Sequence, residues 1–169
     1  ATTTQLSIAI LDVIDWANLQ FPGNAQICEG SSFTAYGQLY NTGAVNTPDP
    51  GAAVGVTVQI GYSLTNTNPN TWTTWQSASF NAQIGNNDEY QGVLSGLAPG
   101  TYYYTFRYQI NGCSWQYGGY SGVGGGFWNG TTNLSGVLTV VPAPQAGADA
   151  AVSLCNSGSP LNLFSTLGA

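Results

Sequence analysis

Basic residues are almost absent from this sequence. Of its 169 residues one is basic, Arg107, and there is no lysine and no histidine. Charged residues make up 5% of the chain, against roughly 25% in an average soluble domain. Binding to a nucleic acid or to an anionic membrane surface needs several Lys or Arg side chains, so we expect neither partner. No apolar run approaches the length of ~18 residues that inserts across a bilayer, so we expect no membrane insertion.

The missing histidine and lysine also restrict catalysis. The usual general bases other than carboxylates are lost, and Asp88 and Glu89 are the only adjacent acids in the chain. On a strand two neighbours point to opposite faces, which places them poorly as an acid and base pair. We predict that the protein is not an enzyme and uses no cofactor.

Asp88 and Glu89 are also weak candidates for calcium binding, together with the amides that precede them. A hard cation takes six to eight oxygen ligands, and the spacing here is not that of an EF-hand. A turn capped by Asn and Asp side chains is the favoured interpretation of residues 86–89. We therefore predict no metal site.

Three cysteines are present, which is an odd number. Cys28 precedes the first clear strand and Cys113 follows an Asn-Gly turn, and we predict a disulfide between them. The alternative is that all three cysteines are buried free thiols, as free cysteine often is. Cys155 lies far downstream in a different kind of sequence, and its state is left open.

Strand patterns recur at short intervals, whereas helical periodicity is nearly absent. Apolar residues alternate in 33–40 and most clearly in 56–64. In 102–110 we expect Arg107 to point away from the core, on the face opposite a row made of Tyr102, Tyr104, Phe106, Tyr108 and Ile110. Asn111-Gly112 then predicts a hairpin turn, since both residues tolerate positive φ. Further strands are predicted at 75–80, 89–94, 114–117 and 135–141. This pattern indicates an all-β protein, an antiparallel β-sandwich of about 7–8 strands.

The predicted sandwich occupies residues 14–141 and is flanked by extended segments. Residues 1–13 hold a strand-like alternation, 142–149 read as a Pro-containing linker, and 150–169 form a strand segment or the start of a further repeat. The alternation at the N-terminus fits a donor strand for another copy or this domain's own first strand, with equal weight. The residues predicted to form assembly strands are Gln5, Leu6, Ile8, Ile10, Val152, Leu154, Leu161, Leu163 and Phe164.

Several stretches together carry a family resemblance. They are IDWANLQFP (14–22), TAYGQLY (34–40), GNNDEYQ (85–91), PGTYYY (99–104) and GFWNGTT (126–132). They resemble an immunoglobulin-like β-sandwich repeat found in secreted, multidomain surface proteins of Bacteroidetes-type bacteria. The resemblance implies an immunoglobulin-like fold and an extracellular or cell-surface location, and it brings no catalytic residues with it.

A charge-poor surface is covered by another protein at little desolvation cost. We therefore predict an extracellular structural or adhesive subunit that self-assembles into a filament or surface layer by strand exchange. Its partners would be other copies of itself or neighbouring repeats. One alternative is a carbohydrate-binding module of a secreted protein, whose polysaccharide ligand would stack on Trp72, Trp75, Trp115 and Trp128. The other is a passive spacer repeat.

Overall fold

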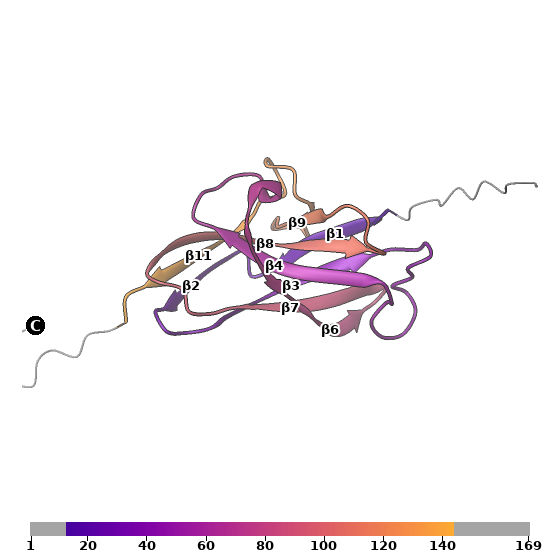
Figure 1. Ribbon diagram of the computed structural model, residues 1–169, viewed down its shortest axis with the longest axis horizontal. Coiled ribbons are helices and arrows are strands. Elements are labelled where there is room, and N and C mark those ends of the chain that lie inside the picture. Colours follow the sequence, from indigo (N-terminus) through magenta and orange to yellow (C-terminus); the bar gives the residue numbers. More distant parts are fainter. Residues whose placement is uncertain (1–12, 144–169) are drawn as a thin grey trace, which may run out of the picture.

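The chain folds into two β-sheets that lie face to face. The computed structural model describes residues 13–143, and its longest helix is a single 3-10 turn, so these residues contain no helix able to cross a membrane. The elements in chain order are β1 (Trp16–Phe21), β2 (Asn24–Cys28), β3 (Phe33–Tyr40), β4 (Val56–Ser63), η1 (Pro69–Thr71), β5 (Thr74–Ser77), β6 (Ser79–Ile84), β7 (Asn87–Leu94), β8 (Gly100–Ile110), β9 (Gln116–Gly119), β10 (Gly126–Phe127) and β11 (Gly136–Val141) (Figure 1).

The strand order is that of an immunoglobulin-like sandwich. The four-stranded sheet has the order β1-β3-β7-β6, which corresponds to strands A, B, E and D of that fold. In the other sheet β4, β8 and β11 lie side by side in the positions of C, F and G, and β5 extends the sheet beyond β4. This confirms the predicted all-β, immunoglobulin-like sandwich.

The structure differs from that prediction in four details. Residues 13–143 form eleven strands, because short pieces such as β5, β9 and β10 add to the main ones. The predicted strand 75–80 was wrong: Ala78 separates β5 from β6, and these two strands belong to different sheets. One strand pair is parallel, since β2 lies along β11 from Asn24↔Val137 to Cys28↔Val141. Strands β1 and β2 were missed in the sequence.

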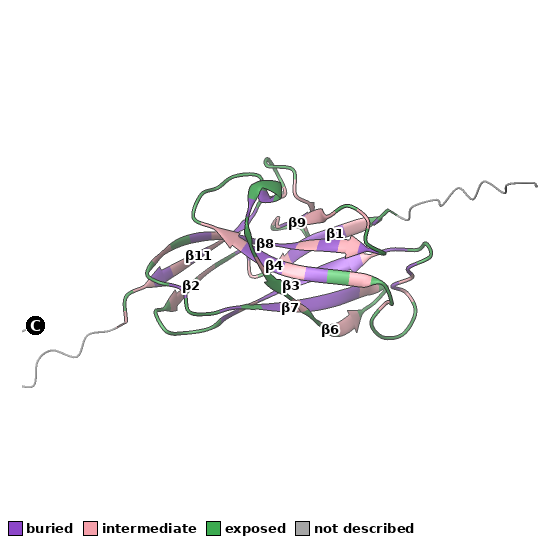
Figure 2. Ribbon diagram, in the orientation of Figure 1, coloured by how far each residue is buried: buried purple, intermediate pink, exposed green. Residues whose placement is uncertain are grey.

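The core lies between the sheets, where Figure 2 shows the buried segments of the central strands. Strand β8 contributes the three largest fully buried side chains of the core, Tyr104, Tyr108 and Phe106. The predicted inward row is confirmed, because its five members are between 0% and 7% exposed: Tyr102, Tyr104, Phe106, Tyr108 and Ile110. The hydroxyls of two of these tyrosines donate hydrogen bonds to backbone carbonyls on the other side of the sandwich. The Tyr108 hydroxyl donates to the Asn18 carbonyl over 2.6 Å, and the Tyr104 hydroxyl donates to that of Pro22. Each buried hydroxyl is thereby satisfied.

Two further contacts fix the first half of β8 in place. The Tyr102 hydroxyl donates to the Ala98 carbonyl over 2.9 Å, which is the tyrosine corner at the entry to strand F. Two residues on, the Tyr104 ring meets Phe33 edge to face, with centroids 4.9 Å apart. An edge-to-face ring pair therefore joins the two sheets at this level of the core.

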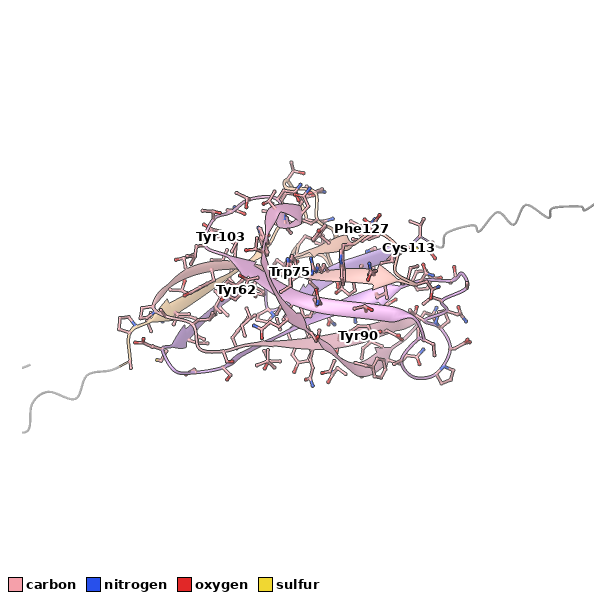
Figure 3. The ribbon with its side chains drawn as sticks, in the orientation of Figure 1. Tyr62, Trp75, Tyr90, Tyr103, Cys113 and Phe127 are labelled. Atoms are coloured by element: carbon pink, nitrogen blue, oxygen red, sulfur yellow. The ribbon has the colours of Figure 1, made fainter. Side chains whose placement is uncertain are left out.

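The predicted Cys28–Cys113 disulfide is wrong, since both cysteines are free. Cys28 pairs with Val141 near the start of β8, while Cys113 follows the far end of β8 (Figure 3). The 11 residues of β8 separate the two thiols by ~30 Å at the usual rise per residue. A disulfide tolerates Cα atoms no more than about 7 Å apart.

The segments predicted to assemble lie outside the described residues. They comprise Gln5–Leu11 and the stretch from Val152 to Phe164. Cys155, whose state was left open, also lies outside the described residues. The strand positions of the sandwich are all filled by residues 16–141. The described chain enters β1 at one end of the long axis and leaves β11 at the other (Figure 1).

Candidate functional site

The outer face of the larger sheet carries an aromatic cluster centred on Arg107. Strand register places Arg107 of β8 beside Gln59 of β4 on one side and Tyr117 of β9 on the other. Trp75 lies on β5, paired with Gly61 of β4. Figure 3 shows Trp75 over the middle of this sheet. The cluster thus brings together side chains of β4, β5, β8 and β9, and Arg107 is its one charged member.

The Arg107 guanidinium is held between two indoles. Its central carbon lies 4.3 Å from the centroid of Trp75 and 4.2 Å from that of Trp115. Nε donates to the Gln59 side-chain carbonyl over 2.8 Å, and Nη2 donates to the same oxygen. Stacking suits a planar, delocalised cation, and a partly desolvated contact of this kind is worth about 1–2 kcal/mol.

The surroundings of Arg107 change the pKa of its guanidinium. Burial lowers the pKa of the guanidinium, and the Tyr117 hydroxyl beside it acts in the opposite direction. Its partners are therefore two indoles, an amide and a phenol rather than a carboxylate. The Arg107 side chain is thus half-buried among these groups on the outer face of β8.

A glycine makes the close approach of Trp75 feasible. A Cβ built on Gly61 would lie 2.3 Å from Cε3 of Trp75 and 2.6 Å from the Thr74 carbonyl oxygen. Any side chain at this position would push the indole off the strand. The ring therefore lies flat over the backbone of β4, within reach of Arg107 and of Tyr117 at 5.9 Å between centroids.

The structure brings together three of the four tryptophans predicted as a glycan platform. Trp72 stacks on Trp75 with centroids 5.8 Å apart, and Trp115 joins them through Arg107. Trp72 is itself 7% exposed, so its faces are mostly used inside the protein. Trp128 has no ring contact with this group; its ring packs against Gly130, and its Nε1 is buried without a hydrogen-bond partner in the described part of the chain.

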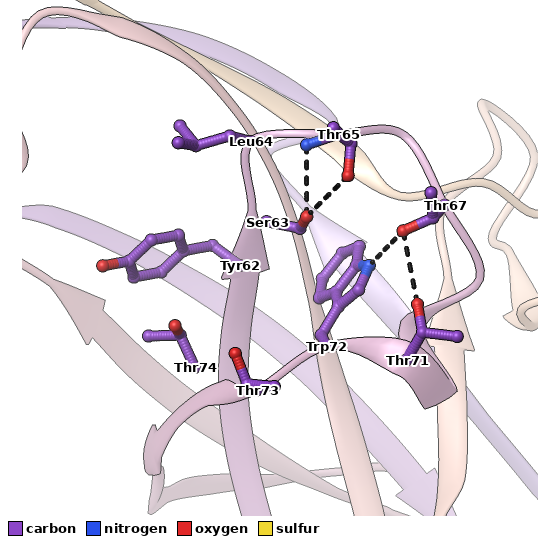
Figure 4. Close-up of a pocket in the computed structure, with 9 residues that line it drawn as sticks. All are labelled: Tyr62, Ser63, Leu64, Thr65, Thr67, Thr71, Trp72, Thr73 and Thr74. Carbon is purple, nitrogen blue, oxygen red and sulfur yellow. Dashed lines mark hydrogen bonds between the residues drawn. The ribbon is translucent and has the colours of Figure 1, made fainter.

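A hollow borders the cluster on the side of Trp72. It measures about 570 Å³ and lies between the end of β4, η1 and the start of β5 (Figure 4). The lining residues are mostly hydroxyl-bearing and none is charged: Tyr62, Ser63, Leu64, Thr65, Thr67, Thr71, Trp72, Thr73 and Thr74.

The two weak calcium candidates do not share a ligand site. The Asp88 carboxylate lies between the sheets, fully buried, and accepts from the Ala53 amide over 2.8 Å. Glu89 accepts from Asn81 Nδ2 over 2.6 Å, on the opposite face of β7, as expected for strand neighbours. Residues 13–143 hold no group of three His, Cys, Asp or Glu side chains that could bind one metal ion.

Sequence reasoning placed Arg107 on the outer face but missed its partners. The Asn111-Gly112 turn, with φ of 48° and 74° at its two residues, is confirmed, and it sets the return strand beside β8. That register was the available clue to the pairing of Arg107 with Tyr117. The approach of Trp75 over Gly61 had no such clue, because β5 and β6 were merged into one strand.

Comparison with known proteins adds little beyond this geometry. No family model matches the sequence, and no curated protein matches it. Among solved structures, the Lin-41 filamin domain is similar with a TM-score of 0.33 and 8% sequence identity, over 74% of this chain and 91% of that one. A similarity of this size carries no argument about function.

Proposed function

We propose that the chain is an extracellular structural or adhesive β-sandwich subunit that self-associates by adding an extended segment of one copy to a sheet edge of the next. The observation that carries this proposal is the open edge of β6. This strand pairs with β7 on one side and with no other strand of residues 13–143. Within the described residues its outward N–H and C=O groups face no strand, and an edge of this kind is a template for pairing with another chain.

The sequence of β6 does little to protect that edge. Sandwich proteins usually guard an edge strand with charges, proline or a bulge. The strand reads SFNAQI, without charge or proline, and its register shift between Phe80 and Ala82 is its one protective feature. A neutral, proline-free edge of this kind suits strand addition, in which main-chain hydrogen bonds supply affinity.

Surplus strand-like sequence supports the same proposal. The apolar alternation in Gln5–Leu11 lies outside the described residues, and its sequence suits a donor strand for another copy. A donor strand and an open edge on one chain would make a head-to-tail contact, which polymerises when it does not close into a ring. The described termini at opposite ends of the long axis favour an end-to-end arrangement (Figure 1).

The remaining parts of the proposal rest on the sequence. The chain lacks histidine and lysine, which supports a non-enzymatic role without a cofactor. Its motifs resemble repeats of secreted, multidomain surface proteins of Bacteroidetes-type bacteria, which supports an extracellular or cell-surface location. Neighbouring repeats of such a protein are equivalent partners to other copies of this chain.

Light scattering coupled to gel filtration, with electron microscopy of the same samples, tests the proposal. We expect concentration-dependent oligomers or filaments from the full chain, and their loss in the double variant Ser79→Lys/Ile84→Lys, which charges the two exposed ends of β6. Val93→Lys is the matched control, since Val93 is exposed at 44% on an interior strand. A strictly monomeric chain at high concentration would overturn self-association in favour of a passive spacer.

A further inference from the structure

We propose that the hollow beside Trp72 binds a neutral saccharide. The inference is independent of self-association, because the hollow lies at the β4–β5 end of the larger sheet and not at the edge formed by β6. Its volume of about 570 Å³ falls within the usual range of small-molecule sites. The chemistry of its lining indicates the class of ligand.

One wall of the hollow is fixed by hydrogen bonds among its own residues. The Thr71 hydroxyl donates to the Asn68 carbonyl over 2.8 Å, so in its 3.4 Å contact with Thr67 it is the acceptor. Thr67 Oγ1 in turn accepts from Trp72 Nε1 over 3.3 Å. These bonds use the donors of the wall and hold the Trp72 ring in place (Figure 4).

Other hydroxyls of the hollow keep free hydrogen-bonding capacity. Thr73 and Thr74 are exposed, and no hydrogen bond of their hydroxyls is found within residues 13–143. Ser63 and Thr65 share a single hydroxyl–hydroxyl contact of 3.2 Å, which consumes one of their two protons. Each hydroxyl can donate once and accept twice. The hollow therefore offers several groups that both donate and accept, as the hydroxyls of a sugar do.

Apolar surface lies next to these hydroxyls. Tyr62 is held edge to face on Tyr102 with centroids 5.4 Å apart, and it pairs with Thr74 across β4 and β5. Leu64, two residues further along, is 66% exposed and lies on the same side of the strand end as Tyr62 (Figure 4). A sugar ring combines C–H faces with a rim of hydroxyls, and aromatic rings with nearby polar groups suit both parts.

The absence of charge in the lining selects a neutral ligand. None of its nine residues is acidic or basic. The nearest element of the aromatic cluster is Trp75, which stacks on Trp72, and the Arg107 charge beyond it is covered by indoles. An acidic sugar would find no cation to replace its lost hydration, whereas a neutral one loses no charge solvation.

Two-dimensional 15N NMR of the full chain tests the site, with maltohexaose, cellohexaose and xylohexaose as neutral probes and trigalacturonic acid as the charged comparison. We expect at least one neutral probe to shift the Trp72 indole N–H resonance and the backbone of 63–74, and to leave the Trp128 indole unmoved. The double variant Thr73→Val/Thr74→Val keeps side-chain shape and removes two hydroxyls. It should weaken binding about ten-fold, the size of one or two lost hydrogen bonds.

The control variant is Thr57→Val, which makes the same change at an exposed position of β4 away from the hollow. It should bind as the unmodified chain does. Shifts caused only by trigalacturonic acid, no shift with any probe at millimolar concentration, or unchanged affinity in the Thr73/Thr74 variant would each overturn the proposal. Matching melting temperatures of the three proteins show that a loss of binding is not a loss of fold.

Discussion

Arg107 and Asp88 show two opposite ways of holding a charge in a chain that has very few. Arg107 lies on the outer sheet face, where two indoles cover its flat sides and Gln59 accepts two of its N–H groups. Asp88 is 0% exposed between the sheets. One of its oxygens accepts from Ala53 at 2.8 Å and Tyr90 at 3.4 Å, while Oδ1 is buried without a partner among the described residues.

Within residues 13–143 neither charge has an opposite charge as its partner. The cation is delocalised and weakly hydrated, so aromatic faces replace much of its solvation. A carboxylate is compact and needs several donors, and residues 13–143 provide only two for Asp88: the Ala53 amide in the loop before β4 and the Tyr90 hydroxyl on β7. Burial accordingly raises the pKa of Asp88, against the opposing effect of these two hydrogen bonds. We conclude that the Arg107 cluster stabilises the fold, whereas the ionised form of Asp88 weakens it.

The largest change in stability is expected from Gly61→Ala, which would disrupt the contact between Trp75 and Arg107. The added Cβ would overlap the Trp75 ring at 2.3 Å and the Thr74 carbonyl at 2.6 Å. The indole must leave Arg107, and the free energy of unfolding should fall by about 3 kcal/mol, as in overpacked sites. Urea unfolding measures it. Gly122→Ala, where a Cβ meets nothing within 4 Å, is the control, and an equal response of the two variants would contradict the assignment.

A smaller loss is expected from Arg107→Lys, which keeps the charge. Lysine cannot present two N–H groups to Gln59 in one plane or stack a flat surface between the indoles. We expect a loss of about 1–2 kcal/mol, with a changed near-ultraviolet circular dichroism from Trp75 and Trp115. A Lys variant as stable as the unmodified chain, with an unchanged spectrum, would mean that charge alone matters at this position.

The sequence was sufficient to predict on which faces of their strands Arg107 and Asp88 lie. Alternation in 102–110 placed Arg107 outward and the tyrosines inward, and neighbouring positions on one strand placed Asp88 and Glu89 on opposite faces. These are properties of a single strand with a period of two residues. Strand pairing across the molecule is not such a property, which is why the parallel pair of β2 with β11 went unpredicted.

The contacts around Arg107 could not be predicted from local sequence patterns for the same reason. Whether Trp75 reaches Arg107 depends on the break between β5 and β6 at Ala78 and on the lack of a side chain at Gly61. Whether Cys28 meets Cys113 depends on which end of β8 each one occupies. Both are long-range relations, fixed by register rather than by composition.

On the Asp88 side, Asp88→Asn should have the opposite sign and stabilise the protein. The amide is nearly isosteric with the carboxylate, can keep the contact with the Ala53 N–H, and removes a poorly solvated charge. We expect a gain of about 1 kcal/mol at neutral pH by thermal or urea unfolding. Glu89→Gln is the matched control: Glu89 accepts a 2.6 Å bond from Asn81, so its substitution should bring no gain. A destabilised Asp88→Asn variant would show that Oδ1 has a strong partner.

The smallest effect, and the sharpest check on Asp88, is the pH dependence of that gain. Because the pKa of Asp88 is raised in the folded state, the folded chain binds more protons than the unfolded chain between the ordinary and the raised value. Stability therefore rises as pH falls through this window, by at most about 1.4 kcal/mol per pH unit for one group.

The variant Asp88→Asn lacks this group, so its stability advantage over the unmodified chain should shrink on acidification and vanish once Asp88 is protonated in both states. Taking the difference between the two proteins cancels the titration of the other acids, which both share. An advantage that stays constant from neutral pH to below the ordinary Asp value would mean that the amide gains a new hydrogen bond, and that the buried charge itself costs nothing. A growing advantage would mean that the pKa is lowered by donors around Oδ1, which would reverse the contrast with Arg107.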